Sequence, residues 1–125
     1  MNIAIIGQNC IFRDSLRLLL NQVADFTVVF DSDDIPELQD YPEASSIDVV
    51  LFDCCYGNED FSSLINKINK LSPNIKILIM TDSFWQYYWL NQKKYSIEGI
   101  ILRDSGKLEF EKEIKSLIKP NWDLV

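Results

Sequence analysis

The 125-residue sequence contains no histidine, and this absence excludes several kinds of chemistry. Acid/base catalysis by imidazole, phosphohistidine chemistry and histidine-containing metal sites all require that residue. Cysteine is scarce too, because Cys10, Cys54 and Cys55 are an odd number of thiols without the spacing of a disulfide framework. Reduced thiols of this kind are typical of a cytoplasmic protein. Free cysteines often act only as small buried apolar residues. The alternative is that Cys10 and Cys54 form a redox pair or a thiolate metal site.

Long hydrophobic runs and net positive charge are also missing. No apolar run approaches the roughly 20 residues that span a bilayer. Residues 1–7 lack a basic leader, so we expect neither a membrane anchor nor a signal peptide. The net charge of −7 argues against nucleic acid as a partner of this domain alone. The balance of 47% hydrophobic and 25% charged residues is typical of one ordinary globular domain.

Five short β-type runs alternate with helical patterns along the chain. The predicted strands are Asn2–Ile6, Asp25–Phe30, Ile47–Phe52, Ile75–Met80 and Ile97–Leu102. The predicted helices are Cys10–Val23, a short helix that begins near Asp34 and Pro36 and ends before Pro42, Glu59–Leu71, Phe84–Lys93 and Lys107–Ile118. Such alternation predicts a parallel sheet with right-handed crossovers.

At this length the best prediction is an α/β flavodoxin-like (βα)5 three-layer sandwich with strand order 2-1-3-4-5. Residues 1–119 form the predicted domain, and residues 120–125 are a tail or the start of a linker. In such folds the ligand crevice lies at the carboxyl ends of the strands. Those ends carry Gly7 and Gln8, Asp53, Thr81 and Arg103.

Asp53 is the first candidate for chemistry among these residues. It ends the apolar run 48–53, whose β-branched and aromatic residues predict a strand buried on both faces. A carboxylate at the carboxyl end of such a strand lies at the predicted crevice. The alternative is that Asp53 only caps a turn.

Four motifs, in order and with matching spacing, resemble the receiver domain of bacterial two-component response regulators, of the NarL/FixJ type. They are Ile11-Phe12-Arg13, the run from Asp48 to Asp53, the run from Ile77 to Thr81, and the run from Gly99 to Asp104. The resemblance implies that Asp53 matches the phospho-accepting aspartate. It also implies that Thr81 matches the hydroxyl that turns toward the phosphoryl group, although a strand-end threonine bonded to backbone fits equally well.

The sequence departs from that family at four positions, one of them Gly57, where many receivers have proline. The acidic pair that binds a divalent cation is replaced by Gly7 and Gln8, and the phosphate-contacting lysine is replaced by Arg103. Mg²⁺ usually requires carboxylates, so we expect no cofactor and weak Mg²⁺ binding at best. We expect a direct ion pair between Arg103 and Asp53, because guanidinium binds carboxylate well.

These departures favour a non-enzymatic pseudo-receiver that signals by protein contact and homodimerisation, largely independent of phosphorylation. The resemblance implies a role in transcription regulation, with DNA bound only through a C-terminal domain absent from this sequence. The alternative is a true receiver phosphorylated at Asp53 by a histidine kinase. A flavodoxin-type cofactor binder is a third possibility, but the loop 7–10 is a poor phosphate cradle.

Two surfaces are candidates for protein contact. The first is an aromatic run, in which some side chains are expected to be exposed, although packing within a loosely built helix is the alternative: Phe84, Trp85, Tyr87, Tyr88 and Trp89. The second pairs the last helix with the first, through Leu108, Phe110, Ile114 and Leu117. The acidic residues Asp31, Asp33 and Asp34 are expected to form a helix cap and a solvated turn.

Overall fold

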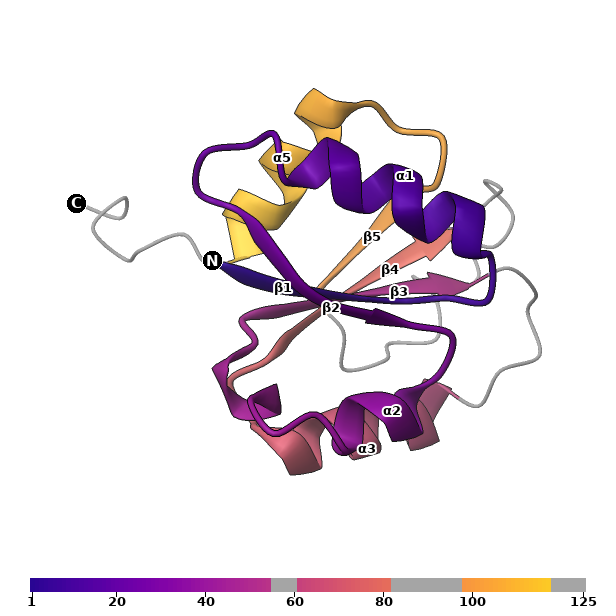
Figure 1. Ribbon diagram of the computed structural model, residues 1–125, viewed down its shortest axis with the longest axis vertical. Coiled ribbons are helices and arrows are strands. Elements are labelled where there is room, and N and C mark those ends of the chain that lie inside the picture. Colours follow the sequence, from indigo (N-terminus) through magenta and orange to yellow (C-terminus); the bar gives the residue numbers. More distant parts are fainter. Residues whose placement is uncertain (55–60, 82–97, 118–125) are drawn as a thin grey trace.

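A parallel five-stranded sheet of order β2-β1-β3-β4-β5 forms the centre of the molecule. The computed structural model describes residues 1–54, 61–81 and 98–117. Helices α1 and α5 cover one face of the sheet, and α2 and α3 cover the other (Figure 1). The strand order and the three-layer architecture predicted from the sequence are therefore confirmed.

The elements lie close to their predicted positions. The strands are β1 Asn2–Ile6, β2 Thr27–Ser32, β3 Val49–Cys54, β4 Lys76–Thr81 and β5 Gly99–Leu102. The helices are α1 Cys10–Leu20, α2 Ile35–Gln39, α3 Phe61–Leu71 and α5 Lys107–Leu117, with a 3-10 turn at Ala44–Ser46 that was not predicted. The predicted aromatic helix at 84–93 and the tail at 120–125 lie outside the described residues. No helix in the described part of the chain is long and apolar enough to cross a membrane.

Helix α1 ends at Leu20, three residues before the predicted end. The side chain of Asn21 accepts a hydrogen bond from the Val28 N–H at 2.9 Å, and the Val23 N–H donates to the Leu20 carbonyl at 3.0 Å. These bonds turn the chain toward β2. The apolar spacing of the sequence continues past the end of the helix into this turn, and for this reason the predicted helix was too long.

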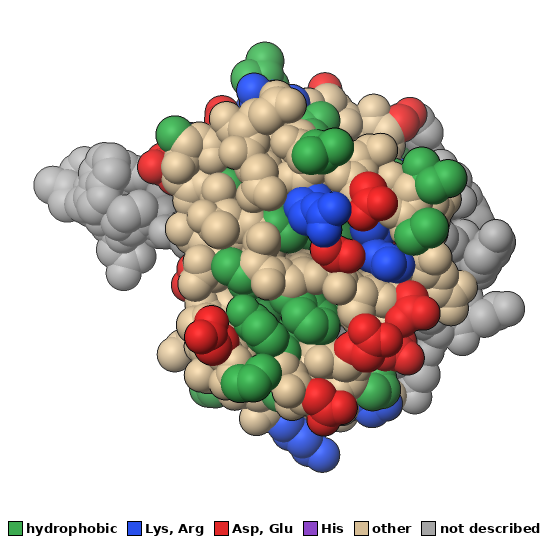
Figure 2. Space-filling view, in the orientation of Figure 1, with side chains coloured by type: hydrophobic (Ala, Val, Ile, Leu, Met, Phe, Trp, Pro, Cys, Tyr) green, Lys and Arg blue, Asp and Glu red, His purple; other side chains and the backbone are tan. Residues whose placement is uncertain are grey.

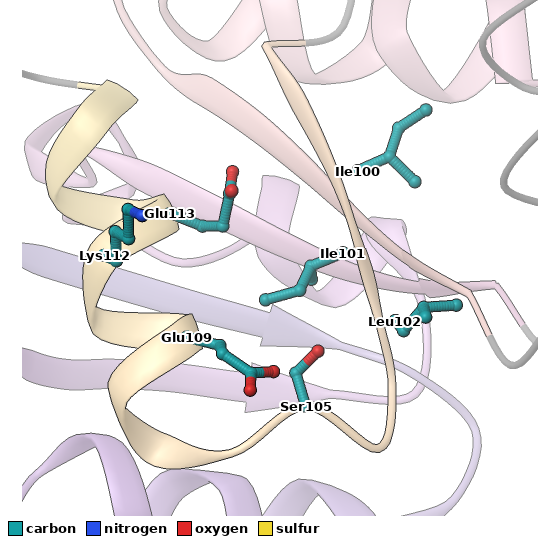
Figure 3. Close-up of a pocket in the computed structure, with 7 residues that line it drawn as sticks. All are labelled: Ile100, Ile101, Leu102, Ser105, Glu109, Lys112 and Glu113. Carbon is teal, nitrogen blue, oxygen red and sulfur yellow. The ribbon is translucent and has the colours of Figure 1, made fainter.

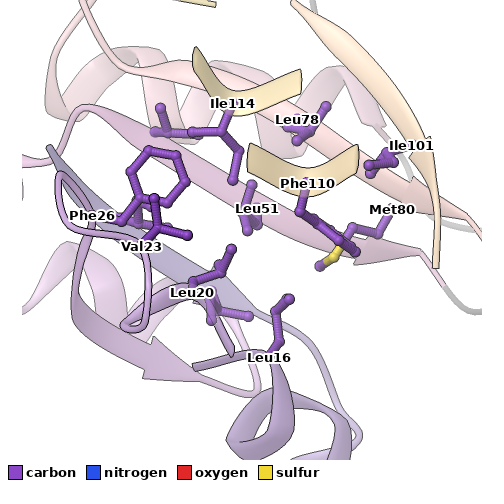
Figure 4. Packing of buried hydrophobic residues seen from close by; sticks show 13 residues of the cluster. Leu16, Leu20, Val23, Phe26, Leu51, Leu78, Met80, Ile101, Phe110 and Ile114 are labelled. Atoms are coloured by element: carbon purple, nitrogen blue, oxygen red, sulfur yellow. The ribbon is translucent and has the colours of Figure 1, made fainter. Parts of the chain in front are cut away.

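Consecutive strand residues alternate between two hydrophobic cores, one on each face of the sheet. In β1, Ile3 and Ile5 pack with residues of α1 and α5, whereas Ala4 and Ile6 pack with residues of α2 and α3. Figure 4 shows the first of these cores, where side chains of Phe110 and Ile114 meet the central strands. Strand β3, which carries Asp53, is thus buried on both faces, as predicted.

Three large apolar side chains point outward instead of into these cores. Ile11 is 75% exposed, Leu18 is 65% exposed and Leu108 is 76% exposed. Ile11 and Leu18 are in α1 and Leu108 is in α5, so both helices carry apolar residues on their outward sides. Phe110 and Ile114 are buried core residues, so the contact surface predicted for the last helix keeps only Leu108 as a fully exposed member.

A β-bulge in β2 determines toward which face of the sheet the polar end of this strand points. Ile3 pairs with Val28 and Ala4 pairs with Phe30, so Val29 is an extra residue. Val29 and Phe30 consequently both pack on the core beneath α2 and α3. Asp31 is then turned to the opposite face, where α1 lies.

Candidate functional site

Asp53 is the last residue but one of the central strand β3 and lies at the carboxyl edge of the sheet. Its side chain is fully buried. In the β3–β4 ladder Asp53 pairs with Met80, and the next residue, Cys54, pairs with Thr81. The strand therefore delivers a buried carboxylate to the predicted crevice, between the ends of β1 and β4.

Arg103 follows β5 and directs its guanidinium to this carboxylate. Its backbone N–H donates to the Thr81 carbonyl at 2.6 Å, which anchors the residue beside the end of β4. Its Nη2 donates to Asp53 Oδ2, so the ion pair predicted from the sequence is present. The arginine side chain is 21% exposed and the carboxylate is not exposed at all. Since a buried carboxylate is costly without a partner, the guanidinium helps to compensate the cost of burying Asp53.

Phe12 holds the other side of this guanidinium. The Arg103 Cζ atom lies 4.6 Å from the centre of the Phe12 ring, within the range of a cation–π contact. Phe12 is in the first turn of α1, where its N–H donates to the capping side chain of Asn9 at 3.0 Å. The arginine is therefore held between a carboxylate from β3 and an aromatic ring from α1.

Gly7 gives Asp53 the space to pack. A Cβ atom built on Gly7 would lie 2.7 Å from the Asp53 Cβ and 3.2 Å from its Oδ2. The nearer of these atoms is bonded directly to the backbone, so it cannot swing away as the end of a flexible side chain could. The Gly7 N–H also donates to the Ser32 carbonyl at 3.0 Å, which fixes this residue against β2. No side chain fits at residue 7 unless the ends of β1 and β3 move apart.

The residues around Asp53 do not fit a divalent cation. Gly7 and Gln8 supply no carboxylate, and Gln8 is exposed. Oδ2 of Asp53 already accepts from Arg103, whose positive charge opposes a metal ion at the same place. Among the described residues, three acidic side chains are close enough together to bind one ion, and they lie instead on an exposed turn: Asp33, Asp34 and Glu37.

That exposed acidic turn changes the titration of Glu37. Partial desolvation and the neighbouring carboxylates of Asp33 and Asp34 raise the pKa of Glu37, while Arg13 acts in the opposite direction. Asp34 also caps α2, whose first turn contains Pro36, as the sequence predicted. The turn thus has a structural role at the start of α2.

Thr81, the last residue of β4, is fully buried. Within the described part of the chain its hydroxyl has no hydrogen-bond partner. A buried hydroxyl of this kind is uncommon, because most find a partner. The position agrees with a hydroxyl beside the phospho-acceptor, and no backbone group among the described residues accepts from or donates to this hydroxyl.

A network of two arginines and two aspartates borders the site and was not predicted from the sequence. Arg13 Nη1 donates to the Gly7 carbonyl, and its Nε lies 3.4 Å from Asp31 Oδ1. Arg17 contacts Asp31 at 2.9 Å and Asp14 at 3.2 Å. Figure 2 shows side chains of both charges side by side on this face, next to an acidic patch. The i, i+4 spacing of the arginines was visible in the sequence, but the bulge that turns Asp31 toward them was not.

The structure brings together Gly7, Asp53, Thr81 and Arg103, as the sequence predicted, and it leaves Gln8 on the surface. The aromatic run from Phe84 to Trp89 lies outside the described residues, as does Cys55. Cys10 is an exposed thiol at the first residue of α1.

Comparisons with known proteins find similarity of structure only. Neither a protein-family model nor a curated protein sequence matches the chain. A pilus assembly-related protein from Burkholderia pseudomallei has a TM-score of 0.77 at 13% identity, over 94% of this chain and 88% of its own. The signal receiver domain of the response regulator NarL from Mycobacterium tuberculosis has a TM-score of 0.72 at 18% identity, over 95% of this chain and 97% of its own.

RcsB, solved as two dimers bound to two parallel DNAs, has a TM-score of 0.77 at 22% identity. The match covers 95% of this chain but 64% of the RcsB chain, so this chain spans less than two thirds of that protein. At such identities the likeness is one of fold. This chain has the fold of response-regulator receiver domains.

Proposed function

We propose that this chain is an atypical receiver domain that signals by protein contact, largely independent of phosphorylation, in the regulation of transcription. One observation carries the proposal: the guanidinium of Arg103 binds Oδ2 of Asp53, at the position where a receiver would accept its phosphoryl group. The arginine then supplies a permanent positive charge where a receiver would recruit a metal ion.

Phosphoryl transfer to a carboxylate depends on positioning and on neutralising charge on the phosphoryl oxygens. The residues at positions 7 and 8 provide no carboxylate for the metal that would neutralise that charge. Attack by Oδ2 also requires that the guanidinium leave the carboxylate, which would separate a buried charge from its cation. Both effects oppose phosphorylation of Asp53, so the proposed domain needs neither Mg²⁺ nor a histidine kinase.

Incubation with a small phosphodonor such as acetyl phosphate and Mg²⁺, followed by intact mass measurement, tests the proposal. We expect no change in mass under conditions that phosphorylate a receiver with a complete acidic pair, which serves as the positive control. A stoichiometric gain of one phosphoryl group that disappears in Asp53→Asn would overturn the proposal.

The same experiment examines the second candidate function, a true receiver phosphorylated at Asp53. The buried hydroxyl of Thr81 favours it, because this side chain has no hydrogen-bond partner in the described part of the chain and stands next to the carboxylate-bearing strand. In this second case Arg103 would contact the phosphoryl group in place of a lysine, since guanidinium binds phosphate bidentately.

The proposed signalling form is a homodimer built on α1 and α5. These helices lie side by side on one face of the sheet (Figure 1), and Lys115 of α5 reaches to 4.0 Å from Asp25. Their outward sides carry the three exposed apolar residues Ile11, Leu18 and Leu108. Exposed charges of opposite sign accompany them, Asp14 on α1 and Lys107 on α5. A two-fold arrangement would bring α1 of one copy against α5 of the other, so that both apolar and charged residues find partners.

RcsB, which has this fold, is solved as dimers on DNA, and this supports dimerisation as the way a domain of this kind would act on transcription. In the proposed arrangement, DNA is bound by a separate module of a longer protein. The acidic domain with its net charge of −7 would then serve to pair two such modules.

A further inference from the structure

A groove between β5 and α5 is lined by both polar and apolar side chains. It is separate from Asp53 and from the outward side of α1. Its volume is about 440 Å³, and it is lined by Ile100, Ile101, Leu102, Ser105, Glu109, Lys112 and Glu113. Figure 3 shows the acidic side chains of α5 and the side chains of β5 around this groove. This size falls within the range of pockets that bind ligands.

The groove runs along the free edge of the sheet. Ile100, Ile101 and Leu102 are consecutive, and consecutive strand residues point to opposite faces. All three can line one space only if that space lies along the edge of the strand. In the described part of the chain β5 pairs with β4 alone, so its outer edge is not hydrogen-bonded to another strand.

The ladder fixes which backbone groups of this edge point outward. Leu102 pairs with Thr81, and the Arg103 N–H donates to the Thr81 carbonyl at 2.6 Å. Because backbone groups in a parallel ladder alternate in direction, the backbone groups of Gly99 and Ile101 face β4, and the N–H and C=O groups of Ile100 point away from it. The groove therefore offers backbone donors and acceptors in the pattern that an added strand would use.

Two carboxylates of α5, those of Glu109 and Glu113, lie near this edge. Glu113 Oε2 lies 3.9 Å from the position that a Cβ on Gly99 would occupy, so the missing side chain of Gly99 brings the carboxylate close to the strand. Glu109 accepts a hydrogen bond from the Gly106 N–H at 3.3 Å. Neither glutamate forms an ion pair with another described residue. Lys112 stands between them, which leaves the rim with one net negative charge.

We propose that the β5–α5 groove binds an extended peptide segment of a partner protein, added as a strand to the outer edge of β5. The segment would alternate basic and apolar residues. Its basic side chains would face Glu109 and Glu113, and its apolar side chains, on the opposite face of the added strand, would cover Ile100 and Leu102. The groove would be the surface that contacts a partner in the proposed signalling by protein contact, so this inference rests on the proposed function.

The opposite edge of the sheet offers a comparison. Strand β2 also has a free outer edge among the described residues, but it contains the bulge at Val29. The carboxylate of Asp31 on this strand is already paired with Arg13 and Arg17. Bulges and paired charges make an edge unsuitable for an added strand, so the peptide should select β5.

Two blocked hexapeptides test the proposal on the full chain, one alternating lysine and valine and the other alternating glutamate and valine. Backbone amide shifts in ¹H–¹⁵N spectra report where each peptide binds. We expect the lysine peptide to shift residues 99–102 and the facing residues of α5, with much smaller changes in residues 27–32. The glutamate peptide should not bind.

A matched pair of variants separates a specific site from general attraction to an acidic protein. Glu109→Gln with Glu113→Gln should weaken binding of the lysine peptide by about tenfold, because two charge contacts are lost. Asp33→Asn with Asp34→Asn removes the same charge at a distant exposed turn and should change affinity less than about twofold. Lys112→Glu should strengthen binding several-fold.

No binding of the lysine peptide at millimolar concentration would overturn the proposal, and so would equal weakening by the two double variants or shifts centred on β2. The phosphodonor experiment and this one depend on different residues, so the two can fail separately. If Asp53 is phosphorylated while the peptide still binds at β5, the groove proposal stands without the phosphorylation-independent function.

Discussion

The backbone of Gly7 packs directly on the side chain of Asp53: a Cβ on residue 7 would lie 2.7 Å from the Asp53 Cβ. The adjacent pair Ile6 and Phe52 is in register in the β1–β3 ladder, so the contact is set by the sheet itself. The absence of a carboxylate at residue 7 and the burial of Asp53 are therefore one structural feature. Restoring an acidic residue at position 7 would require the ends of these two strands to separate.

Gly7→Ala should lower the free energy of unfolding by about 2 kcal/mol, because the added methyl group overpacks a site bordered by a backbone-anchored atom. Urea denaturation measures this change. The matched control is Gly106→Ala, where a Cβ would meet nothing within 4 Å. The control should cost less than about 1 kcal/mol, the effect of alanine at a helix start. Equal stability of Gly7→Ala and the parent protein would contradict the contact.

The pairing of Arg103 with Asp53 predicts strong coupling between the two residues. Arg103→Gln should destabilise the protein by about 3 kcal/mol at neutral pH, because it leaves a buried carboxylate without its cation. Asp53→Asn in the same background should recover most of the loss, since a neutral amide replaces that charge. A double-mutant cycle from denaturation curves gives the coupling energy. Additive effects of the two substitutions would show that the ion pair contributes little.

Residue types along the chain were sufficient to predict the strand order and the contact between Arg103 and Asp53. Alternating β and helical patterns allow few topologies, and the carboxyl ends of parallel strands meet at one edge. A guanidinium and a carboxylate brought to that edge were expected to pair. The same reasoning predicted that residue 7 lacks a metal ligand. It could not predict that Asp53 fills the space, since that depends on the separation of two backbones.

Other features of the structure could not be predicted, because they depend on geometry that leaves no pattern in the neighbouring sequence. The bulge at Val29 turns Asp31 toward α1, and the sequence of β2 reads equally well without it. Helix α1 carries apolar residues on more than one side, so periodicity did not separate core-facing Leu16 and Leu20 from outward-facing Ile11 and Leu18. The ring of Phe12 over Arg103 joins distant parts of the chain.

Phe12→Leu should remove the cation–π contact while keeping an apolar side chain on α1. We expect a loss of about 0.5 kcal/mol, at the low end for such contacts because the guanidinium is partly exposed. The same substitution should cost less in the Arg103→Gln background, where there is no cation to contact. Denaturation of the four proteins at one pH measures the difference. An identical cost in both backgrounds would mean that Phe12 acts only through packing.

Leu18→Lys tests the proposed dimer. Leu18 is 65% exposed, so the monomer should tolerate a lysine there, whereas a dimer interface would have to bury its charge. Sedimentation equilibrium should show a dimer for the parent and a dissociation constant at least tenfold higher for the variant. Gln39→Lys adds the same charge at the end of α2, on the other face of the sheet, and should leave association unchanged. Equal dissociation constants for the three proteins would exclude the α1–α5 surface.

Glu37 gives the fold a pH dependence whose sign follows from its raised pKa. Desolvation and the carboxylates of Asp33 and Asp34 favour the protonated form in the folded state. The folded protein then binds more protons than the unfolded chain as the pH rises above the ordinary value of 4.5, so stability falls through this window. Glu37→Gln removes the titrating group and should raise the thermal midpoint at pH 7.

This advantage of Glu37→Gln should vanish below pH 4.5, where Glu37 is protonated in both states. Thermal melts of both proteins from pH 4 to pH 8 measure the gap between their midpoints. Asp104→Asn removes an exposed carboxylate away from the acidic turn and serves as the control for the loss of one negative charge. If Glu37→Gln instead melts below the parent protein at pH 7 and the difference disappears as the pH falls, the folded state favours the ionised form of Glu37, and the turn at Asp33 and Asp34 does not repel it.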